Sequence, residues 1–206
     1  MGSDGIGDAP HIINEEIQDN YPLMKPWSDS AVLSISPSTI EAYIGQVVNF
    51  SVIVRNEGTT TETFNVTLYY AKMPRFGNVT ICYVSIETRT VYNLDSGKNT
   101  MLIFCWDVTD LAPGNYSIKV EATVIPGEID IEDNVAIGPF TIKLKMLGDI
   151  NGDNKVDMRD LSIVALAFGS YLGDSRWNPE ADINGDNKIN MKDLVIICKN
   201  FGETYG

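Results

Sequence analysis

The sequence predicts a multidomain protein in which an all-β antiparallel sandwich is followed by a small α-helical module. Two observations carry this prediction. Apolar and polar residues alternate with the period of a β-strand through the middle of the chain. Near the C-terminus an acidic loop and a helix occur twice, with Asp149 and Asp182 at equivalent positions. We therefore divide the chain into an N-terminal tail (1–28), the sandwich (29–146) and the duplicated module (147–206).

The strands of the middle region are expected where every second residue is apolar. Such runs span Val48 to Val54, Phe64 to Tyr70, Leu102 to Trp106 and Tyr116 to Ala122. Segments rich in Gly, Pro, Asn and Asp separate these runs, as turns require. Short strands at regular spacing favour an antiparallel sandwich. The segment 71–93 is longer than a hairpin needs, so we expect an extra ribbon there.

A tyrosine corner is expected at Leu111-Ala-Pro-Gly-Asn-Tyr116, where the phenol would hydrogen-bond back to the chain near the start of a strand. With Val52-x-Val54-x-Asn56-x-Gly58 and the loop 126–134, this motif makes the region resemble CARDB-type immunoglobulin-like modules of prokaryotic surface proteins. The acidic part of that loop, residues 128–133, is a candidate for a further calcium site. A solvated turn between two edge strands is the interpretation that we favour.

Each copy of the repeat places oxygen-bearing side chains at the spacing of a twelve-residue calcium loop. The expected ligands of the first loop are Asp149, Asn151, Asp153, the carbonyl of Lys155, Asp157 through a water, and Asp160. Those of the second loop are Asp182, Asn184, Asp186, the carbonyl of Lys188, Asn190 through a water, and Asp193. Hard oxygen donors in six or seven places suit Ca²⁺ better than Mg²⁺, which demands a tighter octahedron. We therefore expect two calcium ions.

The loops depart from the EF-hand pattern at two positions. The last ligand is Asp rather than the longer Glu, and the sixth residue is Asn154 or Asn187 rather than Gly. The sharp turn at the sixth residue needs a positive φ, which Asn tolerates best after Gly. The alternative, two solvated acidic turns, is disfavoured because the spacing recurs in register.

A helix is expected after each loop, and none before it. Apolar residues recur at helical spacing in two sets: Leu161, Val164, Ala165 and Phe168, then Leu194, Ile197, Cys198 and Phe201. Gly169 and Gly202 follow, where helix C-caps belong. A duplicated loop–helix unit that lacks its entering helices resembles a dockerin module, over residues 147–206.

The dockerin resemblance implies a non-catalytic module that binds a cohesin module of another protein in a calcium-dependent manner. It also implies that partner specificity concentrates in the two residues before the last ligand of each loop. Residues of the helix face next to the predicted core stripe are added to these two pairs. The expected partner-binding residues are therefore Met158, Arg159, Ile163, Leu166, Met191, Lys192 and Lys199. Because the two residue pairs are nearly identical, one cohesin could bind in two orientations.

We interpret the chain as a docking unit that tethers a larger extracellular surface protein to a cohesin through an immunoglobulin-like spacer. One alternative is structural: calcium stabilises a module whose stripe of Ile163, Leu166 and Ala167 packs on its own sandwich. The other alternative is a fragment of a carbohydrate-active surface enzyme. No catalytic residue is assigned, because the single histidine, His11, makes a Ser-His-Asp triad or a His-ligated zinc site implausible.

The charge of the chain narrows its partners. A net charge of −13, from 28 acidic and 15 basic residues, argues against binding to nucleic acid or to anionic membranes. No apolar run is long enough to span a bilayer, so no membrane insertion is expected. Seven of the acids lie in the two loops, where they repel one another without metal, so folding of the module should depend on calcium.

The family resemblances point outside the cell, to an extracellular or cell-surface location. Met1-Gly2-Ser3 is typical of an expression start, so we expect the native signal peptide to be absent from this sequence. Sequons at Asn49, Asn65, Asn78 and Asn115 fit an exported protein.

Three cysteines and the N-terminal tail complete the predictions. Cys82 and Cys105 are expected on strands and could form a disulfide, whereas Cys198 is expected to be buried on its helix. The tail should contain one short strand at 11–14. It resembles the last turn of NosD-type parallel β-helix domains through Asp4-Gly-Ile-Gly-Asp8 and Asp19-Asn-Tyr-Pro-Leu-Met24.

Overall fold

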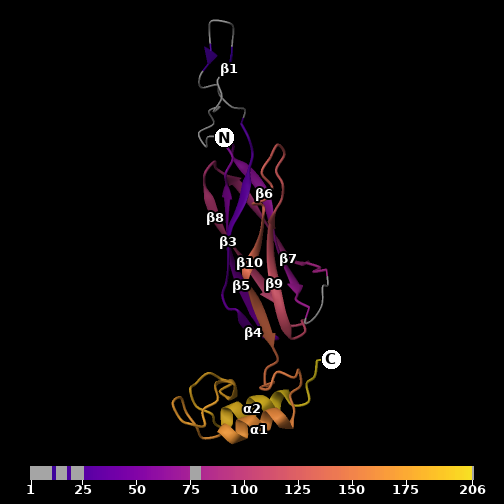
Figure 1. Cartoon of the computed structure of the whole chain (residues 1–206), viewed down its shortest axis with the longest axis vertical. Helices are drawn as coiled ribbons and strands as arrows, with labels where there is room; N and C mark the ends of the chain where they lie inside the picture. Colours follow the sequence, from indigo (N-terminus) through magenta and orange to yellow (C-terminus); the bar gives the residue numbers. More distant parts are fainter. Residues whose placement is uncertain (1–10, 13–17, 20–25, 75–79, 206) are drawn as a thin grey trace.

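The structure is a computed structural model of the chain and describes residues 11–12, 18–19, 26–74 and 80–205. A β-sandwich forms the middle of the molecule, and two helices lie beyond one of its ends (Figure 1). Strands β1 (His11–Ile12) and β2 (Gln18–Asp19) form a short antiparallel pair, so a strand occupies the start of the segment predicted at 11–14. Most residues that carry the β-helix resemblance lie outside the described residues.

The sandwich consists of two sheets. The larger sheet has the strand order β4 (Glu41–Tyr43), β10 (Val135–Lys145), β9 (Gly114–Ala122), β6 (Glu62–Lys72) and β7 (Val84–Leu94). The smaller sheet has the order β3 (Ser30–Pro37), β5 (Val47–Asn56) and β8 (Asn99–Asp107). The prediction of a sandwich is confirmed, with one departure: β4 runs parallel to β10, while the other paired strands of both sheets are antiparallel.

Alternation of side chains builds the core between the sheets. Phe50 of β5 faces Phe104 of β8 in the register of the smaller sheet, and both rings are fully buried. On the larger sheet, Tyr116 of β9 is buried, and its ring centroid lies 5.6 Å from that of Trp106. The hydroxyl of Tyr116 donates a 2.7 Å hydrogen bond to the carbonyl of Ala112, which confirms the tyrosine corner.

The expected extra ribbon within 71–93 is mainly strand β7, which pairs antiparallel with β6 as a full member of the larger sheet. Cys82 precedes this strand instead of lying on it, while Cys105 points away from the core on β8 of the other sheet. Both thiols are free and exposed, so the disulfide that the sequence left open is not formed. Cys82 lies outside the strands, whereas Cys105 lies on a strand of the smaller sheet.

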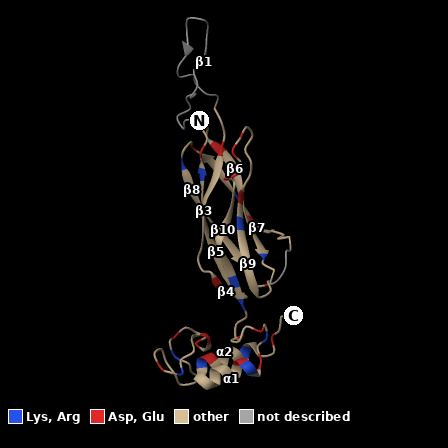
Figure 2. Ribbon diagram, viewed as in Figure 1, with Lys and Arg blue, Asp and Glu red and all other residues tan. Residues whose placement is uncertain are grey.

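The C-terminal module has α1 (Met158–Ala167), a short 3₁₀ turn η1 (Pro179–Ala181) and α2 (Met191–Asn200). The two α-helices follow the two acidic loops, as predicted. Among the described residues no α-helix lies directly before either loop; the short turn η1 comes just before the second. No helix in the described part of the chain combines the length and apolar content needed to cross a membrane. Figure 2 shows the acidic residues, in red, along the loops around the helices.

The predicted inward face of the helices is confirmed in part, because Leu161 and Leu194 pack against the small core of the module as expected. Val164, Ala167 and Ile197 are buried in the small core of the module, whereas Phe168, Cys198 and Phe201 are exposed. Ala165 is exposed as well. Each helix also buries a loop carboxylate in its first turn, Asp160 or Asp193. The buried stripe therefore includes that acid, and the following leucine is partly buried beside it.

Candidate calcium loops and docking face

The first loop winds around the carboxylate of Asp149. Its Oδ1 accepts hydrogen bonds from the backbone N–H of Gly152 at 2.8 Å and of Asp153 at 3.1 Å. Its Oδ2 accepts from the N–H of Asn154 at 2.9 Å. Burial raises the pKa of Asp149, and these three donors act in the opposite direction. The loop backbone thus surrounds the carboxylate of its first acid, which is the first predicted ligand of the calcium loop.

The second loop repeats this arrangement. Oδ1 and Oδ2 of Asp182 accept from the N–H groups of Asp186 at 3.1 Å and of Asn187 at 2.8 Å. The sixth residues, Asn154 and Asn187, have φ values of 66° and 63°, which confirms the expected left-handed turn without glycine. The two loops therefore share one backbone geometry.

The last predicted ligand of each loop is also the structural link between loop and helix. Asp160 is fully buried, and it accepts hydrogen bonds from the N–H groups of Ile150 (2.8 Å), Asn151 (3.1 Å) and Asp157 (2.9 Å). Asp157 in turn accepts from the N–H of Arg159 at 2.7 Å as the N-cap of α1. These contacts form a capping box, which the spacing of Asp157 and Asp160 could have indicated but which the sequence predictions did not include.

Asp193 and Asn190 form the corresponding capping box of α2. Asp193 is fully buried and accepts from the N–H groups of Ile183 (3.0 Å), Asn184 (3.3 Å) and Asn190 (2.9 Å). An Asp in this place has a short reach, so the loop backbone must come close to it. Both loops bring their backbone N–H groups to this carboxylate in the same way.

The middle of each loop brings a carboxylate next to the basic residue at the start of the helix. Oδ2 of Asp153 lies 3.3 Å from Nη1 of Arg159, and Oδ2 of Asp186 lies 2.9 Å from Nζ of Lys192. The hydrogen bond from Lys192 is the main cause that lowers the pKa of Asp186. In both acids Oδ1 accepts a backbone N–H two residues later, so the side chain is oriented from both ends.

The side chains of these loops fit a calcium ion by their donor chemistry. Every predicted ligand offers a carboxylate, carboxamide or backbone carbonyl oxygen, and no nitrogen or sulfur donor is among them. A bound divalent cation would offset the repulsion among the acids of each loop. Lys155 and Lys188 enter the set only through their carbonyls.

The two repeats are joined by reciprocal backbone pairing. Val156 of the first loop donates its N–H to the carbonyl of Glu203 and accepts from the N–H of Gly202, both at 2.9 Å. Ile189 of the second loop donates to the carbonyl of Ser170 at 3.0 Å. Each loop is therefore bridged to the segment that follows the helix of the other repeat.

The predicted partner residues of the two helices are mostly exposed. Met158 and Met191 are 60% and 64% exposed, and Leu166 is 78% exposed. Arg159, Lys192 and Lys199 are also exposed, whereas Ile163 is half-buried. Six of the seven predicted partner residues are thus open to a binding protein.

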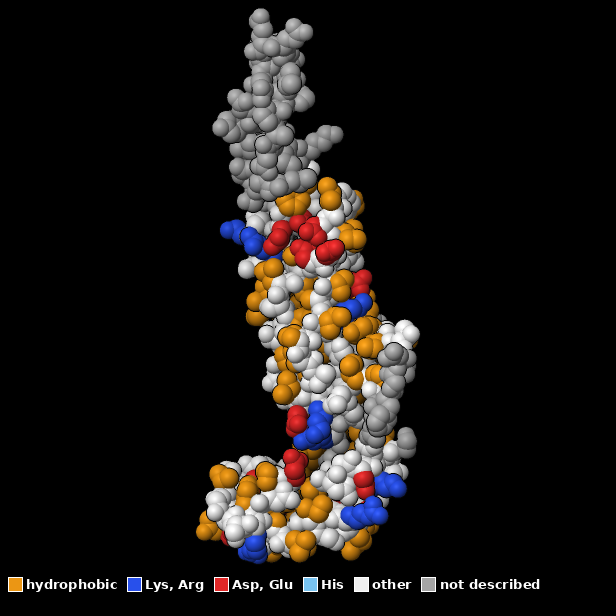
Figure 3. All heavy atoms as spheres, in the orientation of Figure 1, with side chains coloured by type: hydrophobic (Ala, Val, Ile, Leu, Met, Phe, Trp, Pro, Cys, Tyr) orange, Lys and Arg blue, Asp and Glu red, His pale blue; other side chains and the backbone are white. Residues whose placement is uncertain are grey.

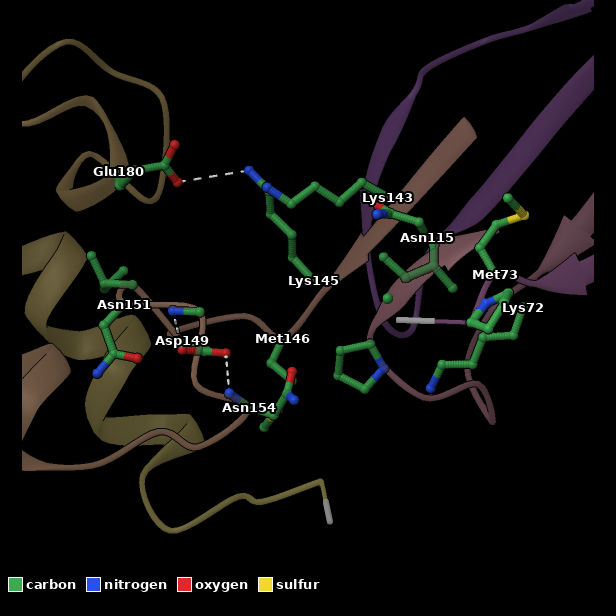
Figure 4. A pocket seen from close by; sticks show the side chains of 16 residues that line it. Lys72, Met73, Asn115, Lys143, Lys145, Met146, Asp149, Asn151, Asn154 and Glu180 are labelled. Carbon is green, nitrogen blue, oxygen red and sulfur yellow. Dashed lines mark hydrogen bonds and ion pairs between the residues drawn. The ribbon is translucent and has the colours of Figure 1, made fainter. Parts of the chain in front are cut away.

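The junction between sandwich and module is narrow. A cleft of about 500 Å³ opens between them, with Lys145 on its sandwich side (Figure 4). Nζ of Lys145 lies 3.7 Å from Oε2 of Glu180 and 2.6 Å from Oε2 of Glu41.

The apolar stripe of the first helix is not covered by the sandwich, because Leu166 is exposed and Ala167 belongs to the core of the module. This placement does not support the contact between stripe and sandwich on which the structural alternative depends.

Residues 147–202 match the family model described as "Dockerin type I domain". No curated protein matches the chain. Among solved structures, the CARDB domain of a Pyrococcus furiosus protein in complex with di-metal ions is similar at 22% identity and a TM-score of 0.42; the match covers 58% of this chain and 96% of that one.

Two β-glucosidases are also similar to the chain. The enzyme from Erythrobacter marinus has 15% identity and a TM-score of 0.44, and the match covers 57% of this chain and 16% of the enzyme. For β-glucosidase 3B from Thermotoga neapolitana the identity is 14% and the TM-score 0.42, again with 57% and 16% coverage. This chain thus corresponds to a minor part of either enzyme.

Dockerins as a family are non-catalytic modules that bind calcium and dock onto cohesins, and they occur in extracellular or cell-surface proteins. The two loops, the helix after each and the family match all fall in the same segment of the chain. Residues 147–202 are therefore a dockerin type I domain.

Proposed function

We propose that this chain docks onto a cohesin of another protein when its two loops bind calcium. In this proposal the sandwich is the spacer that carries a larger extracellular or cell-surface protein. The observation that carries it is the repetition of one arrangement at both helix starts. An exposed Met is followed by an exposed base, and that base pairs with a loop carboxylate.

Calcium would act through the two loops. The ligands in this proposal are the twelve residues named from the sequence, with Asp157 and Asn190 acting through water. Support comes from the backbone contacts that hold the first and last acids of each loop. A metal ion that fixes Asp153 and Asp186 also fixes the bases that pair with them. Calcium dependence of docking follows from this coupling.

The two halves of the docking face are alike but not identical. Met158-Arg159 and Met191-Lys192 are chemically equivalent pairs, which supports binding of one cohesin in two orientations. The equivalent positions 166 and 199 differ, because one is Leu and the other is Lys. We therefore propose that the orientation that places Leu166 centrally buries more apolar surface and is the tighter of the two.

The test is calorimetric titration of the full chain with cohesin modules from the same genome. We expect binding in millimolar Ca²⁺ and none in excess EDTA. Full-strength binding in EDTA, or calcium binding without any cohesin partner, would overturn the proposed docking.

The orientation is tested with paired variants. Met158→Ala/Arg159→Ala and Met191→Ala/Lys192→Ala should each weaken binding by about tenfold or less, since the other orientation remains. Both pairs together should abolish binding. Met101→Ala, which removes an exposed Met from β8 of the sandwich, is the matched control and should have no effect. Loss of binding from a single pair would mean one orientation only.

A further inference from the structure

A second acidic region lies at the end of the sandwich remote from the helices (Figure 3). Asp29 stands directly before β3, Glu57 directly follows β5, and Asp133 lies in the loop before β10. One carboxylate oxygen from each of these residues lies within 4.8 Å of the other two. We call these three residues the carboxylate cluster. It is the one such group of three acids in the described residues.

The cluster contains buried oxygens without partners. Asp29 is 4% exposed, and its Oδ1 is buried without any hydrogen-bond donor. Oδ1 of Asp133 is also buried and also lacks a hydrogen-bond donor. Among the described residues, the one ion pair to this cluster joins Arg55 to the outer residue Glu57 at 3.6 Å. A buried carboxylate oxygen without a donor or a cation carries a large desolvation cost.

The neighbouring acid Glu128 has a different role. Its Oε1 accepts from the N–H of Ser30 at 2.7 Å, and its Oε2 accepts from the N–H of Ile125 at 2.6 Å. These bonds fasten the loop before β10 to the start of β3. The acidic loop is therefore neither a simple solvated turn nor a site by itself. Its residue Asp133 is completed by acids from two other segments.

Backbone hydrogen bonds hold the three segments together. The N–H of Glu57 donates to the carbonyl of Asp29 at 3.1 Å, and the N–H of Val32 donates to the carbonyl of Asp133 at 2.9 Å. Gly58 permits the close approach, since a Cβ there would lie 2.7 Å from the carbonyl oxygen of Trp27. The fold of the sandwich thus brings the carboxylates together, and the backbone contacts keep these mutually repelling groups close to one another.

We propose that the carboxylate cluster is a calcium site, separate from the dockerin loops, that ties the chain entering β3 to the ends of β5 and the β9–β10 loop. All three donors are carboxylates, which select a hard divalent cation over zinc or copper. The unpartnered oxygens of Asp29 and Asp133 are the inner ligands, and Glu57 closes the site from the surface. With three protein carboxylates and an open side for water, the Kd should be on the order of 10⁻⁴–10⁻³ M.

The experiment is a calcium titration of the full chain followed by amide NMR. Amides of Asp29, Gly58 and Asp133 should shift and saturate, and the dockerin loops report independently through their own amides. In Asp29→Asn and in Asp133→Asn the sandwich shifts should disappear while the loop shifts remain. Glu132→Gln removes an exposed acid from the same loop and is the matched control; it should behave as the wild type.

Glu57→Gln guards against misfolding, because this side chain is at the surface and its loss opens no core. It should weaken the response of the sandwich amides by about tenfold or more with an unchanged far-UV spectrum. The site is refuted if the sandwich amides do not move at 10 mM Ca²⁺, or if they move equally in Asp29→Asn. Loop amides that fail to respond would count against the proposed docking function and not against this site.

Discussion

The dockerin loops and the carboxylate cluster both gather acids, but they gather them over very different stretches of chain. In a loop, Asp149 and Asp160 belong to one continuous segment, and each accepts hydrogen bonds from three backbone N–H groups. In the cluster, Asp29 and Asp133 are brought together by the sheets and keep oxygens without donors. Folding of a local loop and binding of its metal therefore depend on each other, whereas a cluster held by folded sheets can form without bound metal.

The largest expected effect separates the two regions by removal of calcium. In excess EDTA the dockerin should lose its helices while the sandwich stays folded. The reason is that the core of the sandwich buries more and larger side chains than the core of the dockerin. Each ion present at about a hundredfold above its Kd contributes about 2.7 kcal/mol to the stability of the module. Hydrogen exchange measured with and without EDTA checks this expectation. Unchanged protection of the amides of α1 and α2 in EDTA would contradict it.

The next effect tests whether a loop acid is structural as well as metal-binding. Asp160→Ala should destabilise the dockerin by about 3 kcal/mol, because three buried N–H groups lose their acceptor. Chemical denaturation in calcium gives the free energy of unfolding. Glu203→Ala removes an exposed acid from the same module and should change stability little. Equal effects of the two substitutions would mean that charge alone matters.

A smaller effect concerns the scaffold beneath the cluster. Gly58→Ala should lower the stability of the sandwich by about 1–3 kcal/mol, because the new Cβ meets backbone atoms of Trp27 and Asp29 at 2.7 and 2.8 Å. Gly45→Ala is the comparison: it has open space and only a backbone conformation with φ near 90°, so it should cost about 1 kcal/mol. If Gly45→Ala proved the more harmful of the two, the close approach at Gly58 would be unimportant.

The smallest effect is a pH dependence of the sandwich in EDTA. Burial, together with the charges of Asp133, Glu128, Glu57 and Asp130, raises the pKa of Asp29 to about 7. A raised pKa means that folding favours the protonated acid, so this contribution is complete below pH 3.8 and is lost as the pH rises through about 7. The urea midpoint of the sandwich should fall over that range, and less so in Asp29→Asn. Identical slopes in both proteins would remove Asp29 as the cause.

Much of the fold could be predicted because the relevant patterns are local. Alternation along β5 decides which residues point inward, and its alternate residues are buried as expected: Val48, Phe50, Val52 and Val54. The turn at Asn154 was predictable for the same reason, since loop spacing and backbone conformation are set within a few residues. The ligand sets and the partner surface stay predictions, which the calcium and cohesin titrations test.

The errors arose where distant segments decide the outcome. Cys198 is exposed, while Asp193 of the same helix is buried against the backbone of the preceding loop, a contact that apolar spacing alone cannot reveal. The sequence left the pairing of Cys82 with Cys105 open, because the distance between two segments far apart in the chain is a property of the whole topology. The carboxylate cluster was missed for a similar reason: Asp29, Glu57 and Asp133 have no common spacing in the sequence.

The reciprocal pairing of the repeats also sets where the dockerin ends. The family match stops at residue 202, yet Val156 of the first loop bonds to Glu203, and Tyr205 donates its N–H to the carbonyl of Asn154 at 2.9 Å. The ring of Tyr205 also packs against the small core. A protein truncated after residue 202 would keep every predicted calcium ligand of both loops and still lose the contacts of residues 203–205 with the first loop. These residues are therefore part of the module, and expression boundaries should be drawn beyond them.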